Sequence, residues 1–139
     1  MSTRCNIEIY DRLDEENPRA ILYHHADGYP DFMQGKLERF MEAAYEYLKE
    51  AGYPYWWDAE RVAAVLIALS IEDYEEPLKP FSTDRGNQFE SKNANAKYRI
   101  DGGVPVFQPC LQLHGDIAYI WKVRLLPEGK FEITHARTY

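Results

Sequence analysis

The spacing of apolar residues predicts strands at both ends of this chain, with helices between them. Cys5, Ile7 and Ile9 alternate with polar neighbours in residues 5–10, which is the period-two pattern of a strand buried on one face. A second apolar run follows at residues 20–25, after a polar turn. Because two strands joined by a short polar loop most simply pair with each other, these runs predict an antiparallel hairpin.

After the first two strands the apolar period lengthens to three or four residues, which predicts an amphipathic helix that ends before Gly52 and Pro54. Its apolar positions are Met33, Leu37, Phe40, Met41, Ala44, Leu48 and Ala51. The charged positions between them, which include Lys36, are expected to face solvent. A second helix is predicted from its capping residue Asp58 to about Ile71, and because it is apolar almost all round we expect it to be buried on most sides.

Strand-like alternation returns in three segments of the last third of the chain, at residues 105–113, 117–125 and 130–135. Residues 127–129 read Pro-Glu-Gly and predict a hairpin turn, whereas residues 73–95 show no sustained period and predict a long loop. The order of elements is therefore β-β-α-α-loop-β-β-β. This order predicts a single α+β domain over residues 1–139, a two-layer sandwich in which two helices cover one face of a largely antiparallel sheet of about five strands.

The composition favours a protein partner over nucleic acid. The formal net charge is −7 and the pI is about 5.1, so no excess of lysine and arginine is present to displace the counterions of a phosphate backbone. An acidic surface instead attracts basic patches on other proteins. The 11 tyrosines and 3 tryptophans add side chains with an apolar face and a polar tip, which suit both cores and protein-binding surfaces.

Three further features predict a cytoplasmic protein without a membrane anchor. The two cysteines, Cys5 and Cys110, do not make a disulfide framework. The first residues lack the long apolar core of a signal peptide. The most apolar run, residues 62–69, is far shorter than the roughly 20 residues needed to span a bilayer.

The segment Tyr-His-His-Ala-Asp-Gly-Tyr-Pro, residues 23–30, predicts the turn from a strand into a helix, because Gly28 tolerates positive φ and Pro30 suits the first helical position. An alternative function, metal-dependent or acid–base hydrolysis, would use a cluster of His24, His25, Asp27, His114 and Asp116. Adjacent residues of a strand point to opposite faces, so the two neighbouring histidines are not expected to reach one ion. We therefore predict no metal and no cofactor.

Two other chemical interpretations come from single residues and short runs. Neither cysteine follows a glycine elbow or begins a helix that would lower its pKa, so both are expected to be inert. As a second alternative function, aromatic and basic side chains interleaved on one strand could stack single-stranded nucleic acid on the sheet. The residues concerned are Tyr119, Trp121, Lys122 and Arg124. Alternation places the two aromatic residues on one face of that strand and the two basic residues on the other.

Three segments together resemble a family of small, uncharacterised proteins encoded by bacteriophages and related mobile elements. These segments are Met-Ser-Thr-Arg at residues 1–4, the histidine-containing segment at residues 23–30, and His-Gly-Asp-Ile-Ala-Tyr-Ile-Trp at residues 114–121. The resemblance covers the ends of the chain better than residues 73–95. It implies a phage-borne accessory protein that works in the host cytoplasm, and it supplies no catalytic residues.

The sequence as a whole favours a binding role over catalysis. We expect a phage accessory protein that binds and modulates a host machine, with inhibition as the favoured outcome, such as RNA polymerase or a CRISPR or restriction effector, through an acidic, aromatic-rich surface. The candidate binding residues are Tyr53, Tyr55, Trp56, Trp57, Glu72, Asp73, Glu75, Glu76 and Arg85. The sequence leaves the partner and the oligomeric state open.

Overall fold

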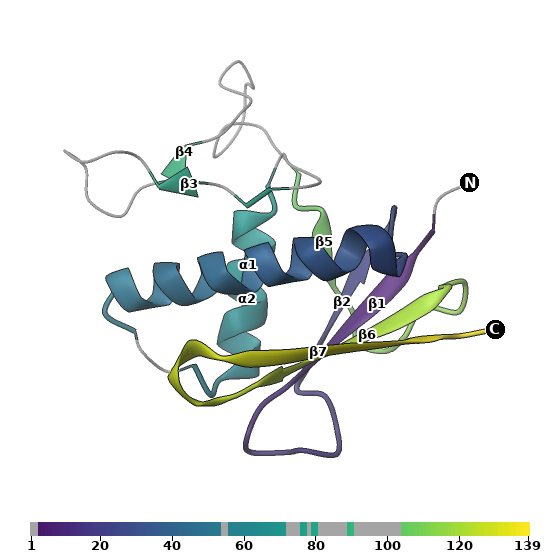
Figure 1. The fold of residues 1–139 in the computed structure, drawn as a ribbon, viewed down its shortest axis with the longest axis horizontal. Helices are drawn as coiled ribbons and strands as arrows, with labels where there is room; N and C mark the ends of the chain where they lie inside the picture. The colour runs from purple at the N-terminus through teal and green to yellow at the C-terminus, as the bar shows by residue number, and fades with distance from the viewer. Residues whose placement is uncertain (1–2, 54–55, 72–75, 78, 81–88, 91–103) are drawn as a thin grey trace.

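The fold is a mixed five-stranded sheet with two helices on one of its faces, which confirms the predicted α+β architecture (Figure 1). The computed structural model describes residues 3–53, 56–71, 76–77, 79–80, 89–90 and 104–139. The strands of the sheet are β1 (Cys5–Tyr10), β2 (Ala20–His24), β5 (Phe107–Pro109), β6 (Tyr119–Leu125) and β7 (Phe131–Arg137).

The strand order across the sheet is β5-β2-β1-β6-β7. The hairpins β1–β2 and β6–β7 are antiparallel, as the sequence predicts, and β2 also pairs antiparallel with β5, whereas β1 and β6 run parallel at the centre of the sheet. Parallel neighbours need a long connection, and here both helices lie in the chain between β1 and β6. The last hairpin, β6–β7, therefore forms one edge of the sheet, and β5 forms the other.

The helices begin and end where the local sequence dictates. Helix α1 (Pro30–Glu50) starts at a proline, whose fixed φ suits the first helical turn. After α1, Gly52 adopts a left-handed φ of 76°, which is typical of a helix C-terminus. Helix α2 (Ala59–Leu69) is capped by Asp58, which accepts a hydrogen bond from the Arg61 backbone N–H at 3.1 Å, and this confirms the predicted cap.

The core lies between the helices and the face of the sheet that they cover. Alternate residues of β1 and β6, including Ile7, Trp121 and Val123, are fully buried on that face. The predicted apolar stripe of α1 is confirmed, because its members from Met33 to Leu48 are all buried. Burial of a side chain of this size stabilises the fold by about 1.5–3 kcal/mol, so this layer dominates the stability.

Three predictions of detail are wrong. Lys36 is fully buried instead of facing solvent. Helix α2 is not buried on most sides, because it packs with one face against the sheet and α1 and leaves Ala64 and Ala68 exposed. The strand predicted over residues 105–113 is only Phe107–Pro109, and one further backbone hydrogen bond, from the Cys110 N–H to the Ile21 carbonyl at 3.0 Å, follows it.

Within the predicted loop at residues 73–95, two short strands pair antiparallel: β3 (Lys79–Pro80) and β4 (Phe89–Glu90). Most of that loop lies outside the described residues. In the part of the chain that is described, no helix is long and apolar enough to cross a membrane.

Candidate functional site

The histidine-containing segment, residues 23–30, connects β2 to α1, which confirms the predicted strand-to-helix turn. Asp27 takes a left-handed φ of 55° at the bend. The Gly28 backbone N–H donates to the Thr3 carbonyl at 2.7 Å, so the segment lies directly against β1. A Cβ added at Gly28 would lie 2.7 Å from the Cβ of Cys5. Glycine is therefore required there by the close approach of β1 and not by its φ.

The two neighbouring histidines point to opposite faces of the sheet, as the strand geometry predicts. His24 is 1% exposed, lies on the helix-covered face and pairs in register with Cys5 of β1. His25 is exposed, and its Nδ1 lies 2.8 Å from the Tyr23 hydroxyl. Because a sheet layer separates them, these histidines do not share a ligand.

His24 forms a buried polar pair with a residue that the sequence pattern did not single out. The Nζ of Lys36 lies 2.9 Å from His24 Nε2, and the lysine side chain is fully buried. Three aromatic rings stand 5.5–5.8 Å from the same Nζ, those of Phe32, Phe40 and Phe107. An ammonium group is stabilised by the negative faces of aromatic rings and by the lone pair of a neutral imidazole.

The electrostatics of this pair follow from burial. Burial, together with the neighbouring Lys36 charge, lowers the pKa of His24 to about 3, so the imidazole is neutral at neutral pH. Nδ1 makes no hydrogen bond of ordinary geometry in the described structure, and the Ala26 backbone opposes the shift only in part. Burial also raises the pKa of the Cys5 thiol to about 12, with Lys36 opposing. The thiol is therefore protonated and a poor nucleophile.

A second group of polar side chains lies on the open face of the sheet. The His114 ring stacks on the Tyr23 ring with a centroid distance of 4.0 Å and an interplanar angle of 11°. The His114 backbone N–H donates to Asn6 Oδ1 at 2.8 Å, which fixes the loop that carries it. Nearby in sequence, Asp116 forms a 2.7 Å ion pair with Arg4, but both side chains are more than a third exposed. Exposed pairs of this kind contribute little to stability.

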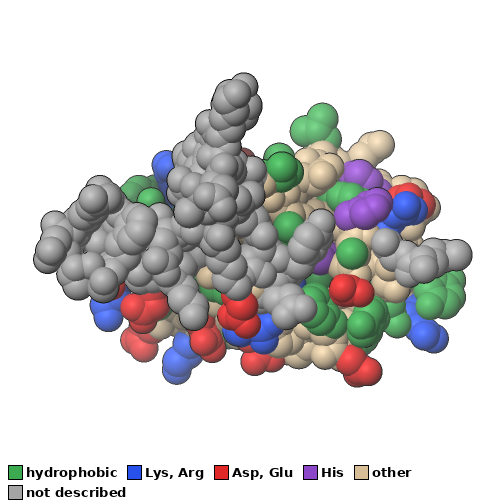
Figure 2. Space-filling model, turned by 90° about the horizontal axis from the view of Figure 1, so that it is seen from above, with side chains coloured by type: hydrophobic (Ala, Val, Ile, Leu, Met, Phe, Trp, Pro, Cys, Tyr) green, Lys and Arg blue, Asp and Glu red, His purple; other side chains and the backbone are tan. Residues whose placement is uncertain are grey.

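The structure thus divides the cluster that the hydrolase alternative would require. His25 and His114 both contact the Tyr23 ring on the open face, whereas His24 lies in the core and Asp27 is exposed at the turn. Figure 2 shows histidine side chains gathered beside acidic and basic ones at one end of the visible face. Among the described residues, no three histidine, cysteine or acidic side chains are arranged to hold a metal ion. The cluster therefore forms no common centre.

The residues of the nucleic-acid alternative are divided as well. Trp121 is fully buried and Tyr119 nearly so, both on the helix-covered face of β6. Lys122 is exposed and Arg124 is half-buried on the open face. These four residues therefore offer no surface on which bases could stack beside basic groups.

The predicted aromatic binding residues separate into buried and exposed ones. Trp56 is 5% exposed, and its Nε1 donates to the Lys130 carbonyl at 2.8 Å, which joins the bridge between the helices to the β6–β7 hairpin. Tyr53 is half-buried and lies 4.9 Å from the Arg61 guanidinium. Trp57, by contrast, is 45% exposed. Of the members of this group that the structure describes, it has the most surface to offer a partner.

An acidic groove of about 480 Å³ lies between α1 and the turn of the β6–β7 hairpin. Its walls include Glu42, Glu46 and Glu76, and among the described residues that line it the cation is Arg39, which pairs with Glu76 at 3.4 Å. Gly129 of the hairpin turn closes one end. The remaining predicted binding residues lie outside the described part of the chain: Tyr55, Glu72, Asp73, Glu75 and Arg85.

A second groove, of about 160 Å³, lies on the other side of the same hairpin turn. We call its exposed residues, with one neighbour in sequence, the hairpin-end surface: Arg12, Leu13, Trp57, Leu126, Pro127 and Glu128. Leu13 is 66% exposed and Leu126 is 39% exposed. Of these residues the sequence pattern identified only Trp57 as a binding residue.

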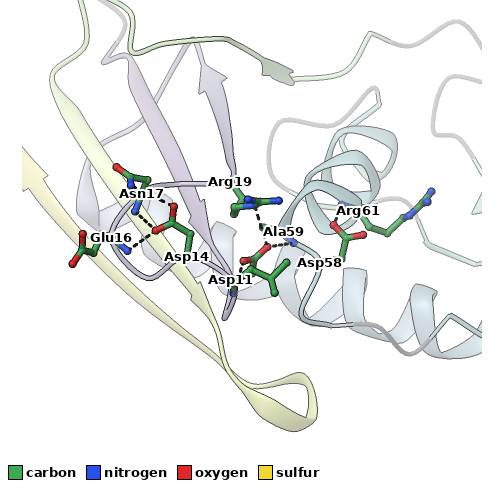
Figure 3. A network of polar contacts seen from close by, with 9 residues as sticks. Asp11, Asp14, Glu16, Asn17, Arg19, Asp58, Ala59 and Arg61 are labelled. Carbon is green, nitrogen blue, oxygen red and sulfur yellow. Dashed lines mark hydrogen bonds and ion pairs between the residues drawn. The ribbon is translucent and has the colours of Figure 1, made fainter.

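A polar network holds the loop between β1 and β2 against the start of α2 (Figure 3). Asp11 is 4% exposed, and its Oδ2 accepts a hydrogen bond from the Ala59 backbone N–H at 3.1 Å. Its Oδ1 accepts one from the Leu13 backbone N–H at 2.9 Å, and the Arg19 Nε lies 3.8 Å from the Asp11 Oδ2. The network therefore sets Leu13 beside the helix end that directly follows Trp57.

Comparison with protein-family models, with curated proteins and with solved structures finds no match. The polar groups of the histidine-containing segment are either buried or divided between two faces. Among the described residues, the hairpin-end surface, the acidic groove and a groove of about 430 Å³ between α1 and α2, lined in part by Tyr53 and Arg61, are open to a partner.

Proposed function

We propose that this protein is a non-catalytic binding module that docks onto a basic surface of another protein through the hairpin-end surface. The observation that carries the proposal is a small groove lined by two large exposed apolar side chains, Trp57 and Leu126, with the exposed Leu13 next in the chain to the lining residue Arg12. Trp57, Leu126 and Leu13 are 45%, 39% and 66% exposed, although they come from three separate segments of the chain. Single exposed apolar residues are ordinary, but apolar groups with a polar rim are typical of protein-binding sites.

The arrangement has the anatomy of a binding hot spot. Tryptophan is enriched among the residues that dominate binding energy. Its contribution is largest where neighbouring residues exclude water from around it. Here the Trp57 ring lines the groove with Leu126 and Pro127, and Arg12 and Glu128 form charged walls. Truncation of such a residue commonly weakens binding by 2 kcal/mol or more, which is about 30-fold in affinity.

Charge indicates the kind of partner. The chain carries a net charge of −7, and the acidic groove lies across the hairpin turn from the hairpin-end surface. A partner with an apolar patch bordered by lysine and arginine would match both features, and its approach would be accelerated by the opposite charges. The resemblance to small phage proteins supports a host complex such as RNA polymerase or a CRISPR or restriction effector as that partner.

The test compares capture from a bacterial lysate by the wild-type protein and by the Trp57→Ser variant, with the bound proteins quantified by mass spectrometry. We expect the wild type to retain one complex in near-stoichiometric amount, and the variant to lose it. The affinity for the purified complex should fall about 30-fold. Because Trp57 is half-exposed, the variant should stay folded, which a thermal melt checks.

The matched control is Leu111→Ser, which removes a fully exposed leucine from the segment that follows β5 at the opposite edge of the sheet. Capture should survive this change. Equal loss of binding in both variants would show that non-specific apolar adsorption causes the capture. Unchanged binding by Trp57→Ser would remove the hairpin-end surface as the docking site.

A further inference from the structure

The two edges of the sheet differ in whether another strand could join them. The β5 edge is three residues long and ends in Pro109, which has no N–H to offer. The β7 edge is seven residues long, contains no proline and pairs, among the described strands, with β6 alone. Natural proteins usually shorten or interrupt such edges, so a long regular one is a candidate for strand addition.

The hydrogen-bond pattern shows which residues of β7 point outward. At the two ends of the β6–β7 pair, the Thr138 N–H donates to the Ala118 carbonyl at 3.0 Å and the Leu126 N–H donates to the Lys130 carbonyl at 2.9 Å. In an antiparallel pair every second residue bonds to the partner strand, so the even-numbered residues of β7 face β6. The odd-numbered ones direct their N–H and C=O groups away from the sheet: Phe131, Ile133, His135 and Arg137.

We propose that the β7 edge accepts an extended segment of a partner protein that carries lysine or arginine at alternate positions, and that this segment becomes an additional strand of the sheet. In such a complex the backbone hydrogen bonds supply affinity, while pockets for alternate side chains supply specificity. The inference rests on the proposed function for the existence of a protein partner. It concerns a different surface and therefore has a separate test.

The preference for basic side chains follows from what lies beside the edge. Helix α1 runs along β7 and packs against it (Figure 1). The acidic groove begins at Gly129, two residues before β7, and includes Glu42 and Glu46 of α1. Alternate side chains of an added strand would point toward this helix layer. At the hairpin end of the edge, lysine or arginine would meet the carboxylates of Glu42 and Glu46, whereas Arg137 lies at the other end of β7.

A second copy of this chain is a less favourable occupant of the same edge. Two β7 strands paired with each other would bring the α1 helices of both copies close together, since α1 packs on β7. The exposed face of α1 carries Glu38, Glu42 and Glu46, and each copy has a net charge of −7. Like charges that approach in this way oppose association.

The experiment uses synthetic peptides of about eight residues that alternate lysine with valine, or glutamate with valine, added to the full chain. Fluorescence anisotropy measures affinity, and hydrogen exchange measures protection of individual amides. We expect the lysine peptide to bind at least about tenfold more tightly than the glutamate peptide. We also expect it to slow exchange at the outward amides of β7, such as Ile133 and His135.

An N-methylated peptide distinguishes strand addition from simple charge attraction, and glutamate variants of the protein test the charge preference. A lysine peptide with N-methyl groups on alternate residues keeps its charge but loses the donors along one edge, so its binding should fall strongly. Equal binding of the methylated peptide, or no protection at β7, would overturn the proposal. Glu42→Gln combined with Glu46→Gln should weaken the lysine peptide, whereas Glu132→Gln on the open face should not.

The remaining outcomes are equally decisive. A protein that dimerises with concentration and protects the β7 amides without peptide would show that a second copy is the occupant, contrary to the proposal. Trp57→Ser should bind the lysine peptide as well as the wild type does, because Trp57 is not on β7. If Trp57→Ser loses capture from the lysate but still binds the lysine peptide, the hairpin-end surface and the β7 edge are two independent binding sites.

Discussion

Protonation of His24 should link the stability of the fold to pH. The folded protein holds this imidazole neutral, with a pKa of about 3, because the side chain is buried beside Lys36. In the unfolded chain an ordinary histidine takes up a proton near pH 6.5. Between these two values the unfolded state binds more protons than the folded state, so stability falls as the pH falls through this window.

The expected size of the effect between pH 7 and pH 5 is about 2 kcal/mol, since each pH unit below 6.5 contributes about 1.4 kcal/mol. This figure does not depend on the exact folded pKa of His24. Any value below about 4 leaves the folded imidazole about nine-tenths neutral or more at pH 5. The prediction therefore tests whether the group is held neutral.

The assay is urea unfolding at both pH values for the wild type and the His24→Gln variant. The variant is less stable overall because Lys36 loses its imidazole partner, but its loss of stability on going to pH 5 should be smaller by about 2 kcal/mol. Met41→Ala is the matched control, since it removes buried apolar atoms from α1 without removing a titratable group. It should cost about 2–4 kcal/mol at both pH values and keep the wild-type pH dependence. If the wild type and His24→Gln lose the same stability, His24 takes up its proton in the folded state as well, and the argument from burial is refuted.

Two other predictions concern the contact of Gly28 with β1 and the hydrogen bonds of Asp11. Urea unfolding measures the change in the free energy of unfolding for both. Gly28→Ala should destabilise the protein by about 1–3 kcal/mol because the new Cβ meets β1, whereas Gly115→Ala, which has no atom within 4 Å of its added Cβ, should be near neutral. Asp11→Ala should cost about 1–3 kcal/mol because it leaves buried N–H groups without an acceptor, more than the roughly 1 kcal/mol expected for the exposed cap removed in Asp58→Ala. A neutral Gly28→Ala would mean that the turn shifts freely, and an Asp11→Ala effect no larger than that of Asp58→Ala would mean that water replaces the network.

Much of the architecture could be predicted because it depends on periodicity. The period-two runs of β1 and β6 and the stripe of α1 each assign a buried face without knowledge of the rest of the chain. The pairing of β1 with β6 could not be obtained in this way. Their residues are more than a hundred positions apart, and strand patterns carry no information on which distant strand is the neighbour.

The buried Lys36 shows where a rule based on residue type fails. Spacing alone places it on the apolar stripe, three residues after Met33 and four before Phe40. Its charge suggested the opposite assignment, because lysine is almost never buried without a partner. That partner is His24, twelve positions earlier on β2, and the ring of Phe107 comes from another strand. Such an environment exists only after the layers have packed.

The candidate binding surface was found only in part for a similar reason. Trp57 was identified from a local run of aromatic residues, but Trp56 beside it proved to be core, because it bonds to the β6–β7 hairpin. Leu126 belongs to a polar turn, and nothing local marks it as a neighbour of Trp57 in the groove. Leu13 is brought toward the start of α2 only by the Asp11 network.

Each residue discussed in the histidine-containing segment, residues 23–30, has a structural role in the fold. We therefore assign function to another surface. The Tyr23 ring stacks on His114 on the open face, and His24 pairs with the buried Lys36. Gly28 allows close contact with β1, and Pro30 is the first residue of α1. No such need accounts for leaving Trp57 half-exposed beside the exposed Leu126. Full burial of a side chain of this size would stabilise the fold by about 1.5–3 kcal/mol, and the described structure forgoes part of that gain at both positions in one groove. A partner that covers the groove would recover it, which is why we assign binding to this surface and a structural role to the histidine-containing segment.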